Sequence, residues 1–436
     1  MKRILTILVV LALTLGVTAA AESPTGHVRV QLIGNFSMED TTDQTTGVTK
    51  TGLHVIKEDF ESKHPGITLE FIIMGWDDYV KKTQTMILAN EADVFQVPGI
   101  SMMSDMDVLE PLQPYIDRDG FDLTQYFDGQ VDGWKIMGPN DAEPTIYALP
   151  FLGDTRYICY DKTIFDQWGV EYLSEHPTVE EILEKAKAMT GVNPVTGQQN
   201  YGVMWRGVDT DDTVVNLAEA LGGTWGEGLR FSELTYHFNS PEMVQALEIM
   251  QELAACAPEG MMANAGGENF GLLEGNDVAI NLRAMPSVLR NAKVLGVDSQ
   301  YGVSYLFVNE ETGKGGMFAG SPFAIGKTSQ VKDAAWEFLK YTASDFFQQY
   351  VWNHCSSEGL PCVKSALNFQ GVAGDEQYQL VLNSMSYLWT PRYPYRSVTP
   401  RGSLQSAIQS ALNGSMEVQA ALDQAQAEAE AWSSEQ

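Results

Sequence analysis

The first half of the chain alternates between two hydrophobic patterns. Continuous apolar runs over residues 27–34, 67–74 and 92–99 are typical of buried strands, whereas residues 53–60 and 77–90 place apolar side chains at helical spacing. The order is therefore strand, helix, strand, helix, strand. It predicts a parallel sheet covered by helices on both faces, as in an α/β fold.

The second half continues the alternation and marks its helices with capping residues. Apolar runs over 145–151 and 156–162 predict strands. Thr178, with a glutamate three residues later, predicts a capping box, and Ser240, followed directly by proline, predicts a second helix start. Residues 329–344 form a further amphipathic helical pattern.

One stretch, GSPFAIGKTSQ at 320–330, ends like a loop that wraps nucleotide phosphates. That loop places four residues between its first glycine and its Gly-Lys pair, but Ser321 occupies the glycine position and Gly320 comes one residue too early. The strand would also end inside the loop. We therefore predict a strand over 317–326, a solvated turn at Lys327 and a helix after it, and we expect no cofactor.

The N-terminus has the pattern of a secretory signal peptide. Lys2 and Arg3 precede an apolar run over 4–17, and small residues follow around Ala21. The run is too short to span a bilayer, and no later segment is more apolar. Because the first cysteine is Cys159, a lipid anchor is not predicted. We expect cleavage after a signal peptide over 1–21 and a periplasmic or secreted mature protein.

Charge and length narrow the class of protein. The formal net charge is -30 at pH 7, which disfavours nucleic-acid phosphates and anionic membrane surfaces as partners. A chain of 436 residues exceeds what one hydrophobic core normally supports, so two lobes are expected.

The cysteines predict no metal site, because they form neither a CxxC pair nor a ligand set with histidine. In an oxidising compartment, Cys355 and Cys362 are close enough in sequence to form a disulfide, and this pairing stays open. Cys159 and Cys256 lie in apolar surroundings that favour buried thiols.

Acidic clusters raise a calcium alternative. Asp117, Asp119 and Asp122 have some of the spacing of a calcium loop, but the glycine comes too early for an EF-hand. Turn or helix-cap roles are favoured for them. The acidic run at 209–213 is similarly ambiguous.

Six segments in order give the chain a recognisable signature: residues 55–71, 76–97, 149–170, 178–189, 323–341 and 357–367. Together they resemble the carbohydrate-type extracellular solute-binding proteins of ABC importers, the maltose-binding-protein-like family 1. The resemblance implies an α/β, two-lobed periplasmic-binding-protein fold with crossing hinge strands, acting as a monomer. It also implies a ligand held in the cleft and delivered to permease subunits.

By this resemblance the chain crosses between lobes near residues 150, 282 and 326. Lobe 1 would then contain 22–150 and 283–326, and lobe 2 would contain 151–282 and 327–436.

A sugar presents hydroxyls to polar side chains and flat C–H faces to aromatic rings. Strand ends at the cleft should carry both kinds of residue. The resemblance and the predicted strand ends together give these candidates: Asn35, Phe36, Trp76, Gln96, Asp154, Arg156, Trp205, Arg206, Trp225, Arg283, Ser321, Arg392, Tyr393, Tyr395 and Arg396. Asp154 is the foremost of them. Arg283 stands where many relatives carry a Gly-Pro-Trp-like sequence, which puts an aromatic contact there in doubt.

Five of these candidates are arginines, which bind carboxylates in planar, two-pronged pairs. One hypothesis is therefore an acidic ligand such as a uronate-containing oligosaccharide. The alternative is that the arginines pair with neighbouring acids of this acidic chain, and a neutral sugar is favoured.

Two other classes compete with a transport binder. A secreted glycan-active enzyme would need two carboxylates across the scissile bond, and 57 acids always offer such a pair. The chain has no GxSxG or HExxH motif, so we expect no enzyme. A lectin-like adhesin is the second alternative.

Overall fold

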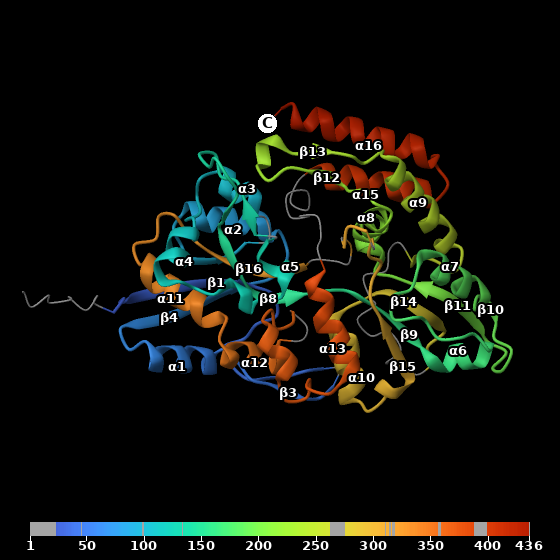
Figure 1. Ribbon diagram of the computed structural model, residues 1–436, viewed down its shortest axis with the longest axis horizontal. Coiled ribbons are helices and arrows are strands. Elements are labelled where there is room, and N and C mark those ends of the chain that lie inside the picture. Colours follow the sequence, from blue (N-terminus) through green and yellow to red (C-terminus); the bar gives the residue numbers. More distant parts are fainter. Residues whose placement is uncertain are drawn as a thin grey trace, which may run out of the picture.

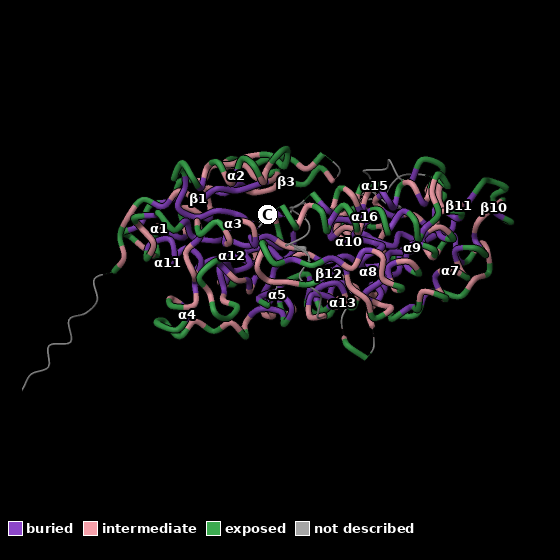
Figure 2. Tube along the Cα trace, turned by 90° about the horizontal axis from the view of Figure 1, so that it is seen from above, coloured by how far each residue is buried: buried purple, intermediate pink, exposed green. Residues whose placement is uncertain are grey.

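The structure is a computed structural model. It describes residues 23–44, 46–97, 100–132, 134–261, 275–309, 311–313, 315, 319–355, 359–387 and 399–435. Two halves, each built around a five-stranded sheet, lie side by side (Figure 1). Buried positions run through the middle of each half, and exposed positions follow the outer faces of the helices (Figure 2).

The first sheet has the strand order β4 (Ile67–Met74), β1 (Gly26–Ile33), β5 (Val94–Gln96), β16 (Ala319–Ile325) and β8 (Ala148–Asp154). Strand β1 pairs in parallel with β4 and β5, which confirms the predicted parallel arrangement. Strand β16 runs antiparallel to both β5 and β8. Strand β8 therefore points the same way as β1, and the carboxyl ends of β1, β4, β5 and β8 share one edge.

Helices cover this first sheet: α1 (His54–Lys63), α2 (Tyr79–Leu88), α3 (Ile100–Asp105), α4 (Gln113–Asp119), α5 (Asp128–Asp132), α11 (Lys332–Thr342) and α12 (Asp345–His354). The predicted helical patterns around 53–60 and 77–90 are confirmed by α1 and α2. The apolar faces of α1, α11 and α12 bury Phe60, Trp336 and Phe347 in the first core, whereas Ile87 of α2 packs in a neighbouring cluster.

The second sheet has the order β10 (Gly191–Val192), β11 (Gln199–Met204), β14 (Val278–Ala284), β9 (Tyr157–Asp161) and β15 (Tyr301–Ser304). Strands β11 and β14 are parallel, and β9 runs antiparallel to both β14 and β15. The carboxyl ends of β11, β14 and β15 therefore lie at the amino end of β9.

Helices of the second half are α6 (Lys162–Trp168), α7 (Val179–Ala188), α8 (Thr210–Ala220), α9 (Pro241–Ala254), α10 (Pro286–Val294), α13 (Glu376–Asn383), α15 (Thr399–Leu412) and α16 (Val418–Ser433). Both predicted N-caps are confirmed, but the Glu181 side chain accepts from the Ser174 amide and hydroxyl, so only the Thr178 half of the predicted capping box forms. Thr178 Oγ1 accepts a hydrogen bond from the Glu181 amide at 3.1 Å, and Ser240 Oγ accepts one from the Met243 amide at 3.3 Å. Short ribbons join β2 (Thr41–Thr42) to β3 (Thr49–Lys50), β6 (Lys135–Ile136) to β7 (Thr145–Ile146), and β12 (Gly226–Glu227) to β13 (Thr235–Tyr236).

Two of the predicted lobe crossings need correction. The first crossing consists of Thr155 and Arg156, between β8 and β9, a few residues beyond the predicted position. Strand β14 is fully buried between β11 and β9, and β15 follows it in the same sheet, so the second crossing lies between Ser304 and Ala319 rather than near 282. Helices α11 and α12 pack beside the first sheet (Figure 1), so the return to the second half follows α12 rather than residue 326.

The Gly-Lys-Thr stretch forms the predicted strand, turn and helix. Strand β16 ends at Ile325, and α11 begins at Lys332. The Lys327 side chain is 42% exposed, and its Nζ lies 2.5 Å from Asp107 Oδ1. It is a turn residue with a carboxylate partner.

The pairing of Cys355 and Cys362 that the sequence left open is not formed in this structure, where both are thiols. Cys362 turns into the first core, where its Sγ lies 3.5 Å from the carbonyl oxygen of Pro150 and burial raises the pKa of the thiol. Cys159 and Cys256 are buried thiols, as expected.

Across the described residues, which begin at Ser23, the helices are all too short or too polar to cross a bilayer.

Candidate functional site

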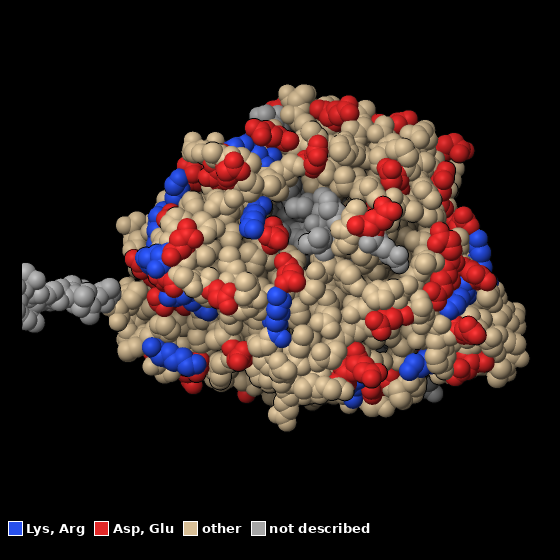
Figure 3. Space-filling view, in the orientation of Figure 1, with Lys and Arg blue, Asp and Glu red and all other residues tan. Residues whose placement is uncertain are grey.

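The carboxyl edges of the two sheets meet at the first crossing. Strand β8 ends at Asp154 and β9 begins at Tyr157, so the carboxyl edge of the first sheet adjoins the edge where β11, β14 and β15 end. Open α/β sheets bind ligands outside the carboxyl ends of their strands. Figure 3 shows a hollow between the two halves on this face of the molecule. The candidate site is the cleft between the two edges.

On the first-lobe side, the residues after β1 and β4 reach solvent. Asn35 is exposed and Phe36 is half-buried directly after β1. Trp76, two residues beyond β4, is 42% exposed and packs edge-to-face on Tyr79 with ring centroids 5.2 Å apart. Among the described tryptophans predicted for the site, Trp76 is the one that keeps an open ring face for a sugar.

Gln96 and Ser321 come together, but inside the sheet. Gln96 Nε2 donates to Ser321 Oγ at 2.9 Å, and Gln96 Oε1 accepts from the Ile33 amide at 2.8 Å. The side chain of Gln96 is fully buried, and that of Ser321 nearly so. Both residues tie β5 to its neighbours and support the strand ends rather than reaching into the cleft.

Asp154 and Arg156 form a pair at the crossing. Arg156 Nη1 donates to Asp154 Oδ1 at 2.5 Å, and the same carboxylate accepts from the Thr155 amide at 2.8 Å. Arg156 is 6% exposed, and its Nε has no hydrogen-bond partner among the described residues. Buried donors are rarely left unpaired, so this Nε is available to a ligand oxygen or a water molecule.

On the second-lobe side, arginines meet the acidic run at the start of α8. Arg283, the next-to-last residue of β14, donates to Asp209 Oδ2 and Asp212 Oδ2, each at 3.0 Å. Arg206 Nη1 donates to the same oxygen of Asp209 at 2.6 Å. From α15, Arg401 Nε donates to Asp211 Oδ2 at 2.7 Å. We call Arg206, Arg283, Arg401, Asp209, Asp211 and Asp212 the arginine–aspartate cluster.

Burial makes the charges of this cluster costly in free energy unless each is neutralised by a partner. The side chains of Asp211 and Asp212 are fully buried and that of Arg283 is 3% exposed. Charges in such a site are stable only when they are paired and hydrogen-bonded. The cluster therefore supports the hypothesis that these arginines neutralise neighbouring acids of the chain rather than bind an acidic ligand. Arg206 and Arg401 keep partial exposure, at 31% and 20%.

Trp205 and Trp225 do not form the expected sugar platforms in this structure. Both rings are fully buried in the core of the second half, together with residues of α8, α9 and α15. Trp205 Nε1 donates to Thr210 Oγ1 at 2.9 Å, so its polar edge is used inside the protein. Large aromatic side chains bury more area than other residues, and here both tryptophan rings contribute to the core instead of a sugar platform.

The remaining candidates divide into two groups. Arg392, Tyr393, Tyr395 and Arg396 lie outside the described residues. The aspartates of the calcium alternative have other roles. Asp117 accepts from Gln113, Asp119 binds Arg118 and Lys340, and Asp122 caps a short 3₁₀ helix (Leu123–Gln125). The run at 209–213 binds arginines.

Sequence reasoning missed the partners in the arginine–aspartate cluster. The acidic run at 209–213 was the available signal, since acids in a first helical turn favour the positive end of the helix dipole. Arg401 gave no signal, because its partner Asp211 lies 190 residues away in the chain.

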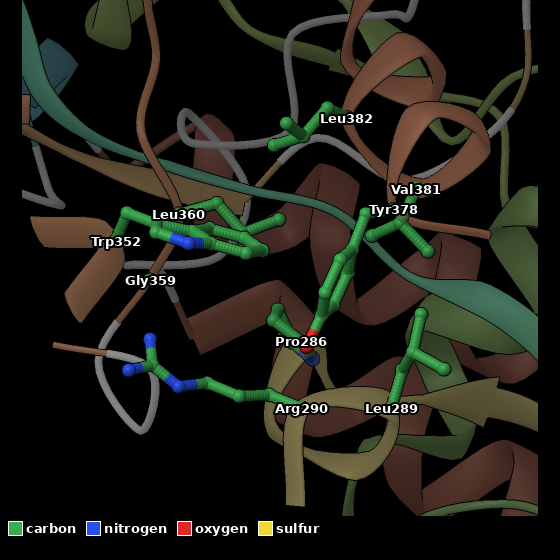
Figure 4. A pocket seen from close by; sticks show the side chains of 9 residues that line it. All are labelled: Pro286, Leu289, Arg290, Trp352, Gly359, Leu360, Tyr378, Val381 and Leu382. Carbon is green, nitrogen blue, oxygen red and sulfur yellow. The ribbon is translucent and has the colours of Figure 1, made fainter. Parts of the chain in front are cut away.

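Behind the crossing, a small pocket separates α10, α12 and α13 (Figure 4). Trp352 of α12 packs edge-to-face on Tyr378 at 4.7 Å, and the Arg290 guanidinium lies 5.6 Å from the Trp352 ring centroid. Arg290 also donates to the carbonyl of Asn353, and burial lowers the pKa of its guanidinium. Because Phe347 and Val351 of the same helix lie in the first core, α12 joins the two lobes here. The mostly apolar lining makes this pocket a packing junction rather than a sugar site.

Known proteins share this architecture. The sugar-binding protein MalE from Xanthomonas citri superposes with a TM-score of 0.73 at 19% identity, covering 92% of this chain and 96% of that chain. A solute-binding protein from Agrobacterium radiobacter K84 in complex with ribitol gives a TM-score of 0.66 at 20% identity, covering 92% and 98%. These likenesses establish the two-lobed fold.

Sequence comparison reaches the same class of protein. The mannitol-binding protein of Pseudomonas aeruginosa is 26% identical over 305 residues, which are 67% of this chain and 66% of that protein. Residues 45–346 match the profile of the bacterial extracellular solute-binding proteins. Because this match covers well over half of the chain and the fold agrees with it, the chain belongs to the bacterial extracellular solute-binding protein family.

Proposed function

We propose that this protein is an exported binder that captures a sugar or polyol between its two lobes and delivers it to the permease of an ABC importer. The observation that carries the proposal is the meeting of two carboxyl sheet edges across a crossing of two residues, Thr155 and Arg156. A ligand bound there contacts both lobes at once. The mannitol-binding relative and the sugar- and ribitol-binding neighbours support the ligand class.

The arrangement of charges supports a neutral ligand. Arg156, Arg206 and Arg283 each already bind a carboxylate of the chain. An acidic ligand would have to compete with these partners, whereas a sugar hydroxyl can accept from Arg156 Nε without breaking an ion pair. The exposed ring face of Trp76, together with Asn35 and Phe36, offers a stacking surface and a polar group on the opposite wall.

Closure follows from the two-lobed contact. A ligand that touches both lobes binds the closed form better, and a difference of about 5.5 kcal/mol moves a two-state equilibrium from 1:99 to 99:1. Closure then reports occupancy to the permease. The ligand is released unchanged, so the proposal assigns no catalytic residue.

Thermal unfolding with a ligand panel tests this function. The panel contains mannitol, ribitol, neutral mono- and oligosaccharides, and uronates. Binding to the folded state alone adds about 2.7 kcal/mol at a hundredfold excess over the Kd, which raises the Tm by several degrees. We expect this rise with a neutral member. No rise with any member would contradict the ligand class, and cleavage products would favour the glycan-active enzyme.

A further inference from the structure

A second pocket lies at the carboxyl edge of the second sheet. It is lined by the first turn of α7, the end of α8, the segment that follows β15, and Tyr387. Because β15 ends at the same edge as β11 and β14, this pocket lies on the cleft side of the sheet. The pocket encloses about 510 Å³, within the ~300–1,000 Å³ that ligand pockets typically span.

His176 and Tyr387 line this pocket, and the ring of Tyr305 packs against both of them. His176 and Tyr305 stack nearly parallel, with centroids 4.5 Å apart and an interplanar angle of 10°. Tyr387 meets Tyr305 edge-on at 5.3 Å. His176 is exposed, and both tyrosines are half-buried, so the group is not part of a closed core. Aromatic faces that remain open beside a pocket suit the flat C–H face of a sugar ring.

Polar groups accompany the rings. The Tyr387 hydroxyl lies 3.4 Å from His176 Nδ1, and the exposed carboxylate of Glu180 belongs to the same lining. Buried Leu306 and Phe307 form an apolar floor. Small-molecule sites usually combine an apolar and aromatic lining with a few polar groups.

Helix α8 separates this pocket from the arginine–aspartate cluster. Asp211 and Asp212 lie in the first turn of α8, whereas Ala220 and Leu221 line the pocket at its other end. Eleven helical residues span roughly 16 Å. One sugar ring or a linear polyol of similar size is too short to contact both ends.

We propose that the pocket lined by His176 and Tyr387, with Tyr305 supporting their rings, is a second sugar-binding subsite, so that the ligand is a neutral oligosaccharide rather than a single ring or a polyol. The inference rests on the proposed function and names its substrate length. In this arrangement one end of the oligosaccharide lies in the cleft beside Arg206 at the start of α8, and a distal ring stacks at Tyr387.

Calorimetry on the full mature chain tests the inference. The probes are mannitol and the malto-, cello- and manno-oligosaccharides of one to five units. In at least one series we expect affinity to rise tenfold or more with chain length. Tyr387→Ala and Tyr305→Ala should each remove most of that gain and leave the affinity for the single unit unchanged. Tyr172→Ala is the matched control, since this tyrosine is 43% exposed in the same lobe but outside the pocket.

Each other outcome has a distinct meaning. If a single unit or mannitol binds and longer chains gain nothing, the subsite is refuted while the proposed function stands. Equal losses for short and long ligands in Tyr387→Ala would also refute it, because they indicate a general structural role. If no carbohydrate or polyol binds the unmodified protein, the proposed function fails, and the inference with it. Unchanged Tm values for the variants confirm that they fold.

Discussion

At the residue scale, Arg283 tests how much the arginine–aspartate cluster contributes. Arg283→Ala removes the cation that bridges Asp209 and Asp212 and leaves their carboxylates with less countercharge in a buried site. Removing one partner of a buried ion pair costs about 3–5 kcal/mol, and we expect a loss of that size in urea unfolding. Arg118→Ala is the control, because Arg118 is 48% exposed, and it should cost about 1 kcal/mol or less. Similar small losses in both variants would contradict the structural role of the cluster.

Aspartates set the response to acid. Burial opposes ionisation of Asp43, but hydrogen bonds from Lys50 and Thr46 outweigh it and lower its pKa to about 2. At Asp93 burial is likewise outweighed by hydrogen bonds, chiefly from Arg29, and its pKa is also lowered. Both folded values lie below the unfolded value of about 3.9, so the stabilisation is complete above that pH and is lost as the pH falls toward 2. We expect the Tm to fall between pH 5 and pH 2, with a shallower slope in Asp43→Asn. A Tm that rises on acidification would contradict this assignment.

Sequence reasoning at this scale placed residues along the strands but could not tell which side chains reach the cleft. Asp154 and Arg156 stand at the crossing where they were expected, but the rings of Trp205 and Trp225 turn inward and that of Trp76 does not. The local sequence predicts that a tryptophan follows a strand. Which way its ring points depends on helices such as α15, nearly two hundred residues away.

At the element scale, helix caps were predictable because their signals are local. Ser240→Ala removes the hydrogen bond to the Met243 amide and should cost about 1 kcal/mol in chemical unfolding. Ser240→Asp supplies another capping oxygen and should restore most of the stability. Equal losses in both variants would show that packing, and not the cap, holds the start of α9.

Strand pairing was predictable only in part. The strand–helix alternation gave the parallel β4–β1–β5 core of the first sheet, because helical connections favour parallel neighbours. Strand β16 lies more than 200 residues after β5 in the chain, and no local pattern indicates that the two strands pair antiparallel. The amphipathic patterns of α11 and α12 likewise indicate that one face of each helix is buried, but they do not indicate which sheet covers it. The third crossing was therefore predicted before α11, whereas both helices pack in the first core.

At the scale of the whole molecule, the account depends on two lobes that hold one ligand. The six ordered segments predicted the family and the two-lobed fold, since both follow from the whole pattern rather than from any one residue. The crossings were less predictable, because β14 has the apolar composition of a hinge strand and of a central strand alike.

Small-angle X-ray scattering of the mature protein, with and without a saturating ligand from the thermal panel, tests this account most directly. If the ligand binds between the carboxyl edges of both sheets, the radius of gyration should fall on saturation, and it should stay constant with a panel member that gives no thermal shift. An unchanged radius of gyration with a ligand that raises the Tm would place the ligand on one lobe and contradict capture by closure.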